Sequence, residues 1–166
     1  MENFIELNDS ELITDILHKA FITVAEEFNF TKENAPRFPA FISSDYIDEQ
    51  FRKGMKLFGY SLNGRIIGCA GYMFYRDRIY EIVRLAVLPE YRHAGIGKKL
   101  MGFVENKIIE NGGSIAEIHA VDKNLLVRKW YKSLGYIEIR IDELKSVPFN
   151  SVVMNKELNQ VQPRTM

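Results

Sequence analysis

The feature that most constrains the fold is an apolar run that ends in a glycine-containing turn. Residues 79–87 are apolar at both odd and even positions, apart from Glu81 and Arg84. Because side chains alternate between the two faces of a strand, this run predicts a central strand covered on both faces. The turn that follows contains Gly95 and Gly97, and helical periodicity begins there.

The rest of the chain alternates strand-like and helical segments. Predicted helices cover residues 9–28, 43–57, 95–111 and 125–134, and predicted strands cover 4–7, 58–62, 65–75, 79–87, 116–121, 136–141 and 151–155. The second helix is expected to turn four side chains inward: Ile47, Phe51, Met55 and Leu57. The element order β-α-α-β-β-β-α-β-α-β-β predicts an α/β (α+β) fold with helices on both faces of a mixed sheet. We expect one domain over residues 1–158 and a frayed tail over 159–166.

Charge and cysteine content exclude several classes of protein. Lysine and arginine total 22, as do aspartate and glutamate, so the formal net charge is zero. This balance argues against a duplex-binding protein and against a polybasic membrane anchor. Cys69 is the only cysteine, which fits a reducing compartment, and no signal peptide or spanning segment is evident. We therefore expect a cytoplasmic protein without nucleic-acid or membrane partners, and the His and Cys spacing predicts no metal site.

The glycine turn is suited to binding phosphate. A helix N-terminus exposes unpaired N–H groups and partial positive charge, and glycines let an anion approach the backbone. Arg92 and Lys98 add side-chain charge. The plain alternative is a turn that only joins a strand to a helix. A P-loop is excluded by Arg92 and Lys99, and a dinucleotide fingerprint by Leu100.

Two motifs resemble those of the GNAT superfamily of N-acetyltransferases. The first is Arg92-x-x-Gly95-x-Gly97 after a hydrophobic strand, which is similar to the family's coenzyme A pyrophosphate loop. The second follows a later strand and reads Asn124-x-x-Val127-x-x-Trp130-Tyr131-x-x-Leu134-Gly135-Tyr136. The resemblance covers most of the chain. It implies a mostly antiparallel sheet of about seven strands, acetyl-CoA as acetyl donor, an amine acceptor that is a small molecule or a peptide, and a possible homodimer.

The resemblance also implies where the cofactor binds. The pantetheine arm would lie against the backbone of Leu85, Ala86 and Val87, beside a bulge in that strand. The pyrophosphate would contact backbone amides of the turn, namely those of Arg92, His93, Ala94, Gly95, Ile96, Gly97 and Lys98. Asn124 would face the pantetheine.

Acyl transfer needs an acid and a base. Tyr131 is seven residues from Asn124 and shares its helix face, which the resemblance directs toward the cofactor's sulfur, so Tyr131 is the candidate acid. Its alternative role is core packing. Glu81 is the candidate base, since burial would raise its pKa; the alternative is a structural carboxylate. Arg84 is at odd spacing from Glu81 and is expected on the opposite face. His119 or water is the other candidate base, and Cys69 is expected to pack rather than react.

The acceptor is left open by the sequence. In the family it is bound by the first two helices, their connection and the last hairpin, which correspond roughly to residues 21–55 and 142–151. These regions are aromatic and acidic, with Glu26, Glu27, Asp45, Asp48 and Glu49. An acidic mouth suits a cationic amine, although such charge is usually a solvated face. A non-catalytic acyl-CoA sensor or interaction module is the alternative function.

Overall fold

The computed structural model describes residues 2–158, and the predicted tail 159–166 lies outside the described residues. These residues form one seven-stranded sheet in the order β1-β2-β3-β4-β5-β7-β6. The elements are β1 (Glu2–Leu7), α1 (Ser10–Phe28), α2 (Ser44–Arg52), β2 (Lys56–Leu62), β3 (Arg65–Arg76), β4 (Ile79–Val87), α3 (Ile96–Glu110), β5 (Ile115–Val121), α4 (Leu125–Ser133), β6 (Ile137–Asp142) and β7 (Ser151–Glu157). Neighbouring strands are antiparallel except for the parallel pair β4–β5. The predicted fold class and element order are confirmed.

Three helices begin where a side chain caps them. Asp9 accepts hydrogen bonds from the N–H groups of Glu11 and Leu12 at the start of α1. Ser43 caps α2, and Asn124 caps α4. These oxygens satisfy N–H groups that have no partner within the helix.

The predicted second helix is too long. It ends at Arg52, and Gly54 then takes a positive φ of 102°. Met55 therefore lies in the connection and Leu57 lies in β2, where both are buried. Their placement on the helix was wrong because pairing of residues 56–62 with β1 and β3 overrides the helical spacing.

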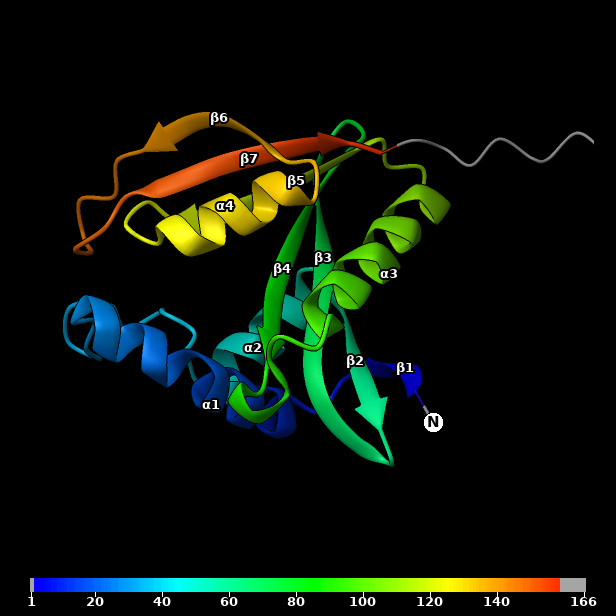
Figure 1. The fold of residues 1–166 in the computed structure, drawn as a ribbon, viewed down its shortest axis with the longest axis horizontal. Helices are drawn as coiled ribbons and strands as arrows, with labels where there is room; N and C mark the ends of the chain where they lie inside the picture. The colour runs from blue at the N-terminus through cyan, green and yellow to red at the C-terminus, as the bar shows by residue number, and fades with distance from the viewer. Residues whose placement is uncertain (1, 159–166) are drawn as a thin grey trace, which may run out of the picture.

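The helices cover the sheet in two layers. Figure 1 shows α3 and α2 on opposite sides of β2, β3 and β4. A second cluster of buried residues joins the α1–α2 connection to the β6–β7 loop. In it the ring centroids of Phe30 and Phe149 are 4.8 Å apart, and those of Phe30 and Phe38 are 5.1 Å apart. The two segments expected to bind the acceptor are thus packed against each other through aromatic rings.

The sheet splits between β4 and β5. The two strands pair only at Ile79, Tyr80 and Glu81, which face residues 115–117. Beyond that point they diverge, and Figure 1 shows β4 running away from β5, β7 and β6. Only Ile82 and Ala86 of β4 are fully buried, so the expected coverage of this strand on both faces is incomplete. The divergence leaves one edge of β4 without a neighbouring strand.

A bulge in β4 accompanies this divergence. Cys69 pairs with Ala86 and Gly71 pairs with Val83, so β4 has one more residue than β3 between these pairs. Arg84 lies in the extra stretch and has a positive φ of 58°. The thiol of Cys69 donates to the carbonyl oxygen of Arg84 at 3.3 Å. The bulge that the family resemblance implied is therefore present.

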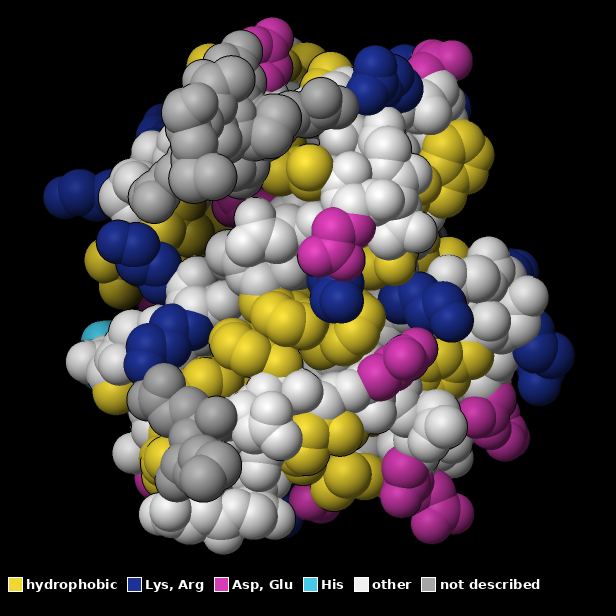
Figure 2. Space-filling view, turned by 90° about the vertical axis from the view of Figure 1, so that its right-hand side faces the viewer, with side chains coloured by type: hydrophobic (Ala, Val, Ile, Leu, Met, Phe, Trp, Pro, Cys, Tyr) yellow, Lys and Arg dark blue, Asp and Glu magenta, His cyan; other side chains and the backbone are white. Residues whose placement is uncertain are grey.

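The charged side chains are mixed on the visible surface. On the face in Figure 2, lysine and arginine alternate with aspartate and glutamate around apolar areas, and they form no basic stripe there. Within residues 2–158, no helix has both the length and the apolar character needed to cross a membrane.

Candidate active site

The glycine turn forms an open cradle of backbone N–H groups. His93 and Gly95 both have positive φ angles, 64° and 79°, and α3 begins at Ile96. Gly95 supplies no side-chain cap, in contrast to the residues that cap α1, α2 and α4. A Cβ atom built on Gly95 meets no atom within 4 Å. The first turn of α3 therefore presents N–H groups and partial positive charge to open space, as an anion site requires.

Arg92 stabilises this turn from behind. Its Nε donates to the carbonyl of Val87 at 3.3 Å, and its Nη2 donates to the carbonyl of Ala20 in α1. Its backbone N–H donates to the carbonyl of Pro89. The guanidinium is thus occupied by backbone carbonyls, so the side-chain charge expected from Arg92 faces α1 and not the cradle.

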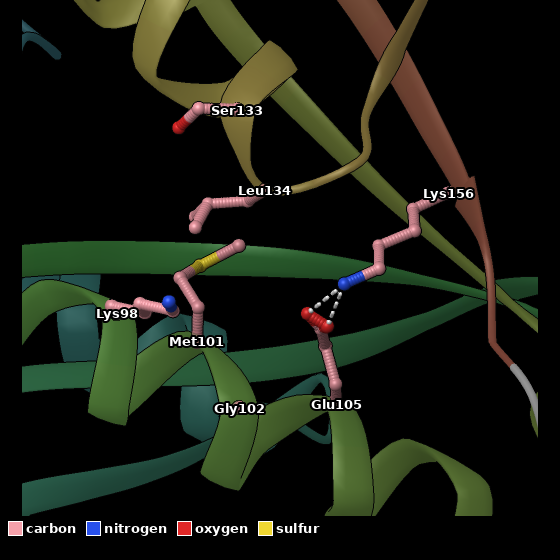
Figure 3. A pocket seen from close by; sticks show the side chains of 7 residues that line it. All are labelled: Lys98, Met101, Gly102, Glu105, Ser133, Leu134 and Lys156. Atoms are coloured by element: carbon pink, nitrogen blue, oxygen red, sulfur yellow. Dashed lines mark hydrogen bonds and ion pairs between the residues drawn. The ribbon is translucent and has the colours of Figure 1, made fainter.

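A pocket of about 260 Å³ lies beside the turn. Figure 3 shows that Lys98 and Met101 line it from α3, Leu134 lines it from the end of α4, and a Glu105–Lys156 ion pair lies at one side. The Nζ of Lys156 is 2.9 Å and 3.0 Å from the two carboxylate oxygens of Glu105.

The free edge of β4 continues from the turn into the split sheet. Ala86 and Val87 pair with β3 on one side only, since pairing with β5 ends at Glu81. Leu85 lies in the bulge between them and Val83. This edge gives an extended ligand backbone groups to bind, in the manner of an added strand. Asn124 lies at the start of α4, and its Oδ1 accepts from the N–H of Val127 at 3.2 Å.

Two carboxylates and a histidine meet at the other end of the split. Glu81 of β4 is in register with Glu117 of β5. The Nε2 atom of His119 is 3.1 Å from a carboxylate oxygen of Glu117 and 3.9 Å from one of Glu81. Its Nδ1 is 3.3 Å from the hydroxyl of Ser151. Burial raises the pKa of Glu81, as does the charge of Glu117, while the charges of His119 and Arg84 lower it.

Tyr131 approaches from the other face of the sheet. The hydroxyl of Tyr80 donates a hydrogen bond to the carbonyl of Asn111 at the end of α3, so Tyr80 lies on the face that α3 covers. Glu81 is the next residue in the strand and therefore points to the opposite face. Tyr131 lies on α4, where its neighbour Trp130 packs against Gly97 of α3. Burial raises the pKa of Tyr131 to about 12. The acid and base candidates therefore flank the split sheet from its two faces.

Comparison with known proteins identifies the family. Residues 16–136 match the acetyltransferase (GNAT) family. The chain belongs to the GNAT family. An uncharacterised N-acetyltransferase of Chlorobaculum tepidum is 37% identical over 76 residues, which are 46% of each protein. The matched segments span less than half the length of the curated relatives.

Solved GNAT structures share the fold at low sequence identity. The ribosomal-protein-S18-alanine N-acetyltransferase of Escherichia coli has a TM-score of 0.75 at 16% identity, over 100% of this chain and 99% of that one. The PaiA N-acetyltransferase of Thermoplasma acidophilum, in complex with coenzyme A, has a TM-score of 0.72 at 17% identity, over 95% and 99%.

Three residues of this GNAT site were missed or misjudged from sequence. Glu117 was missed, although it lies two residues before His119 and hence on the same strand face. With the amide of Asn155 turned so that its nitrogen faces the carboxylate, Asn155 donates to Glu117 at 3.1 Å. Arg84 was expected on the face opposite Glu81. The bulge shifts the alternation by one residue, so its charge lowers the pKa of Glu81.

Cys69 has a structural role in the bulge of this GNAT chain. It is completely buried, and burial raises the pKa of its thiol to about 12. Its hydrogen bond to Arg84 fixes the conformation of the bulge. A thiol that remains protonated is a poor nucleophile, which supports the packing role expected from sequence.

Proposed function

We propose that this chain transfers the acetyl group of acetyl-CoA to a primary amine by direct attack on the thioester. The observation that carries the proposal is the split between β4 and β5, which has an anion cradle at one end and the Glu81 cluster at the other. This arrangement suits a cofactor that carries phosphates at one end and a reactive thioester at the other.

The residues of the cradle and of the β4 edge fit this cofactor. Backbone N–H groups from His93 to Lys98 would bind the pyrophosphate, and Lys98 would add charge at the neighbouring pocket. The edge formed by Leu85, Ala86 and Val87 would bind the pantetheine amides. Arg92 then acts by holding the turn against α1, and Asn124 by positioning the start of α4. When bound, acetyl-CoA supplies the activated acetyl group.

Glu81 would accept the proton of the amine, directly or through a water molecule. A primary amine with a pKa of ~10.4 is neutral in about one molecule in 2,500 at pH 7, a deficit of ~4.6 kcal/mol. A carboxylate whose pKa is raised toward neutrality is a more effective base than an ordinary one. His119, whose Nε2 atom lies 3.9 Å from a carboxylate oxygen of Glu81, or water would be the alternative base.

Tyr131 would stabilise the leaving thiolate. Its hydroxyl stays protonated at neutral pH because its pKa is raised to about 12. A protonated phenol on the cofactor side of the sheet is a hydrogen-bond donor for developing negative charge.

Two measurements test the proposal. Calorimetric titration with acetyl-CoA is expected to show saturable binding, and the absence of binding at high micromolar concentration contradicts it. Thiol release is then followed over a panel of primary amines. Binding without thiol release on any amine would support the alternative, a non-catalytic acyl-CoA sensor.

A further inference from the structure

Two arginines from distant parts of the chain converge on one aromatic ring. The Cζ atom of Arg37, in the α1–α2 connection, is 5.3 Å from the ring centroid of Tyr46. The Cζ atom of Arg84, in the bulge of β4, is 5.7 Å from the same centroid. Tyr46 is in the first turn of α2 and is half-buried. Both guanidinium groups therefore lie beside the ring of Tyr46.

Within residues 2–158, neither guanidinium forms a close ion pair, although the charge of Glu81 acts on Arg84 at longer range. Arg84 donates from Nε and Nη2 to the same neutral amide oxygen of Gln50, at 3.0 Å and 2.8 Å. Within residues 2–158, no carboxylate lies within 4 Å of Arg37 or Arg84. Burial lowers the pKa of Arg84, which means that its charge is poorly solvated. An anionic group would stabilise the poorly solvated guanidinium of Arg84, and the exposed guanidinium of Arg37 lies beside the same ring.

This site lies next to the proposed point of reaction. Arg84 follows Glu81 by three residues, and the bulge brings both side chains to the face covered by α2. Leu85, which follows Arg84, begins the proposed pantetheine edge. Of the acids expected to form an acidic mouth, Asp48 is half-buried and the others are exposed, namely Glu26, Glu27, Asp45 and Glu49, and Glu49 pairs with Lys53. The charges that act on Glu81 are those of His119, Glu117 and Arg84.

We propose that Arg84 and Arg37 bind a carboxylate of the acceptor, so that the amine acetylated here belongs to a free amino acid. The proposal rests on the proposed acetyl transfer and specifies its acceptor class. The amine of such an acceptor would lie at Glu81 and its carboxylate at the two guanidinium groups. Arg52, an exposed arginine in the last turn of α2, offers a control of the same residue type.

The test compares amino acids with their carboxamides, which keep the amine and lack the carboxylate. kcat/KM is measured by thiol release for each pair, and the amino acid to carboxamide ratio is taken for wild type, Arg37→Gln, Arg84→Gln and Arg52→Gln. Arg37→Gln and Arg84→Gln are each expected to lower the ratio about tenfold to a hundredfold, through KM for the amino acid. Arg52→Gln should leave it unchanged. Arg37 is exposed, so Arg37→Gln should fold and keep its acetyl-CoA affinity even where Arg84→Gln does not.

Several results would overturn the carboxylate site. One is a wild-type enzyme that acetylates carboxamides as efficiently as amino acids, which would leave the proposed acetyl transfer intact. Another is an Arg37→Gln variant with an unchanged ratio. Faster turnover of phosphoethanolamine than of any amino acid would assign the two arginines to a phosphate. A complete lack of thiol release with every amine would overturn the acetyl transfer as well.

Discussion

Removal of the Tyr131 hydroxyl tests whether this residue donates a proton or only a hydrogen bond. Burial raises the pKa of Tyr131 to about 12, whereas an ordinary thiol has a pKa of ~8.5. Complete proton transfer from the phenol to the leaving thiolate would then be uphill by ~3.5 pKa units, or ~4.8 kcal/mol. We therefore expect Tyr131 to act as a hydrogen-bond donor, comparable to one donor of an oxyanion hole.

The expected loss follows from that role. Removing one such donor commonly lowers kcat by about a hundredfold to a thousandfold, so Tyr131→Phe should do the same while the Kd for acetyl-CoA changes little. Stopped-assay thiol release gives kcat, and calorimetry gives the Kd. Because the pKa is about 12, Tyr131 should also contribute no alkaline limb to the wild-type pH profile below about pH 10.

Tyr136→Phe is the matched control. The hydroxyl of Tyr136 is buried without a hydrogen-bond partner in the described residues. The ring centroid of Tyr136 lies 5.8 Å from that of Tyr131. Its removal should leave kcat unchanged and raise the free energy of unfolding by about 1 kcal/mol. A Tyr131→Phe variant with kcat within about threefold of wild type would refute the donor role. Loss of an alkaline limb near pH 9 in this variant would instead show that Tyr131 ionises in the wild type, which would contradict its raised pKa.

Four further substitutions test the site and the packing around it. Glu81→Gln should abolish the acid limb of the kcat/KM profile, because the wild-type rate rises as pH rises through the raised pKa of Glu81; an unaltered limb would belong to another group. Gly95 has a φ of 79°, so Gly95→Ala should add about 1 kcal/mol of backbone strain and weaken the binding of acetyl-CoA in calorimetry. An unchanged affinity for acetyl-CoA would argue against the cradle. Gly102→Ala should stabilise α3 by up to about 1 kcal/mol in denaturant unfolding, since a Cβ atom at Gly102 meets no atom within 4 Å. Gly71→Ala should instead lower the free energy of unfolding by about 3 kcal/mol, because its Cβ atom would overlap the carbonyl oxygen of Lys56. Equal effects at these two glycines would contradict the packing described here.

The sequence by itself determined the elements and their order. Asp9, Ser43 and the glycine turn specify helix starts through contacts within a few residues, and Asn63-Gly64 specifies a hairpin through two positive φ angles, 51° and 80°. These are local effects, so they can be recognised without tertiary structure. The position of Cys69 in the core also followed from the apolar strand around it.

Only the tertiary structure decided which charged groups meet. The bulge in β4 brings Arg84 to the face of Glu81, and the β4–β5 register places Glu117 beside it. The same structure turns Arg92 toward α1 and brings Arg37 to the ring of Tyr46. These contacts join residues that are far apart in sequence, and they depend on strand register and helix packing. Strand register and helix packing are not encoded in the local spacing of residues. The charge balance of the chain therefore gave no indication that Arg37 and Arg84 lie beside the same ring.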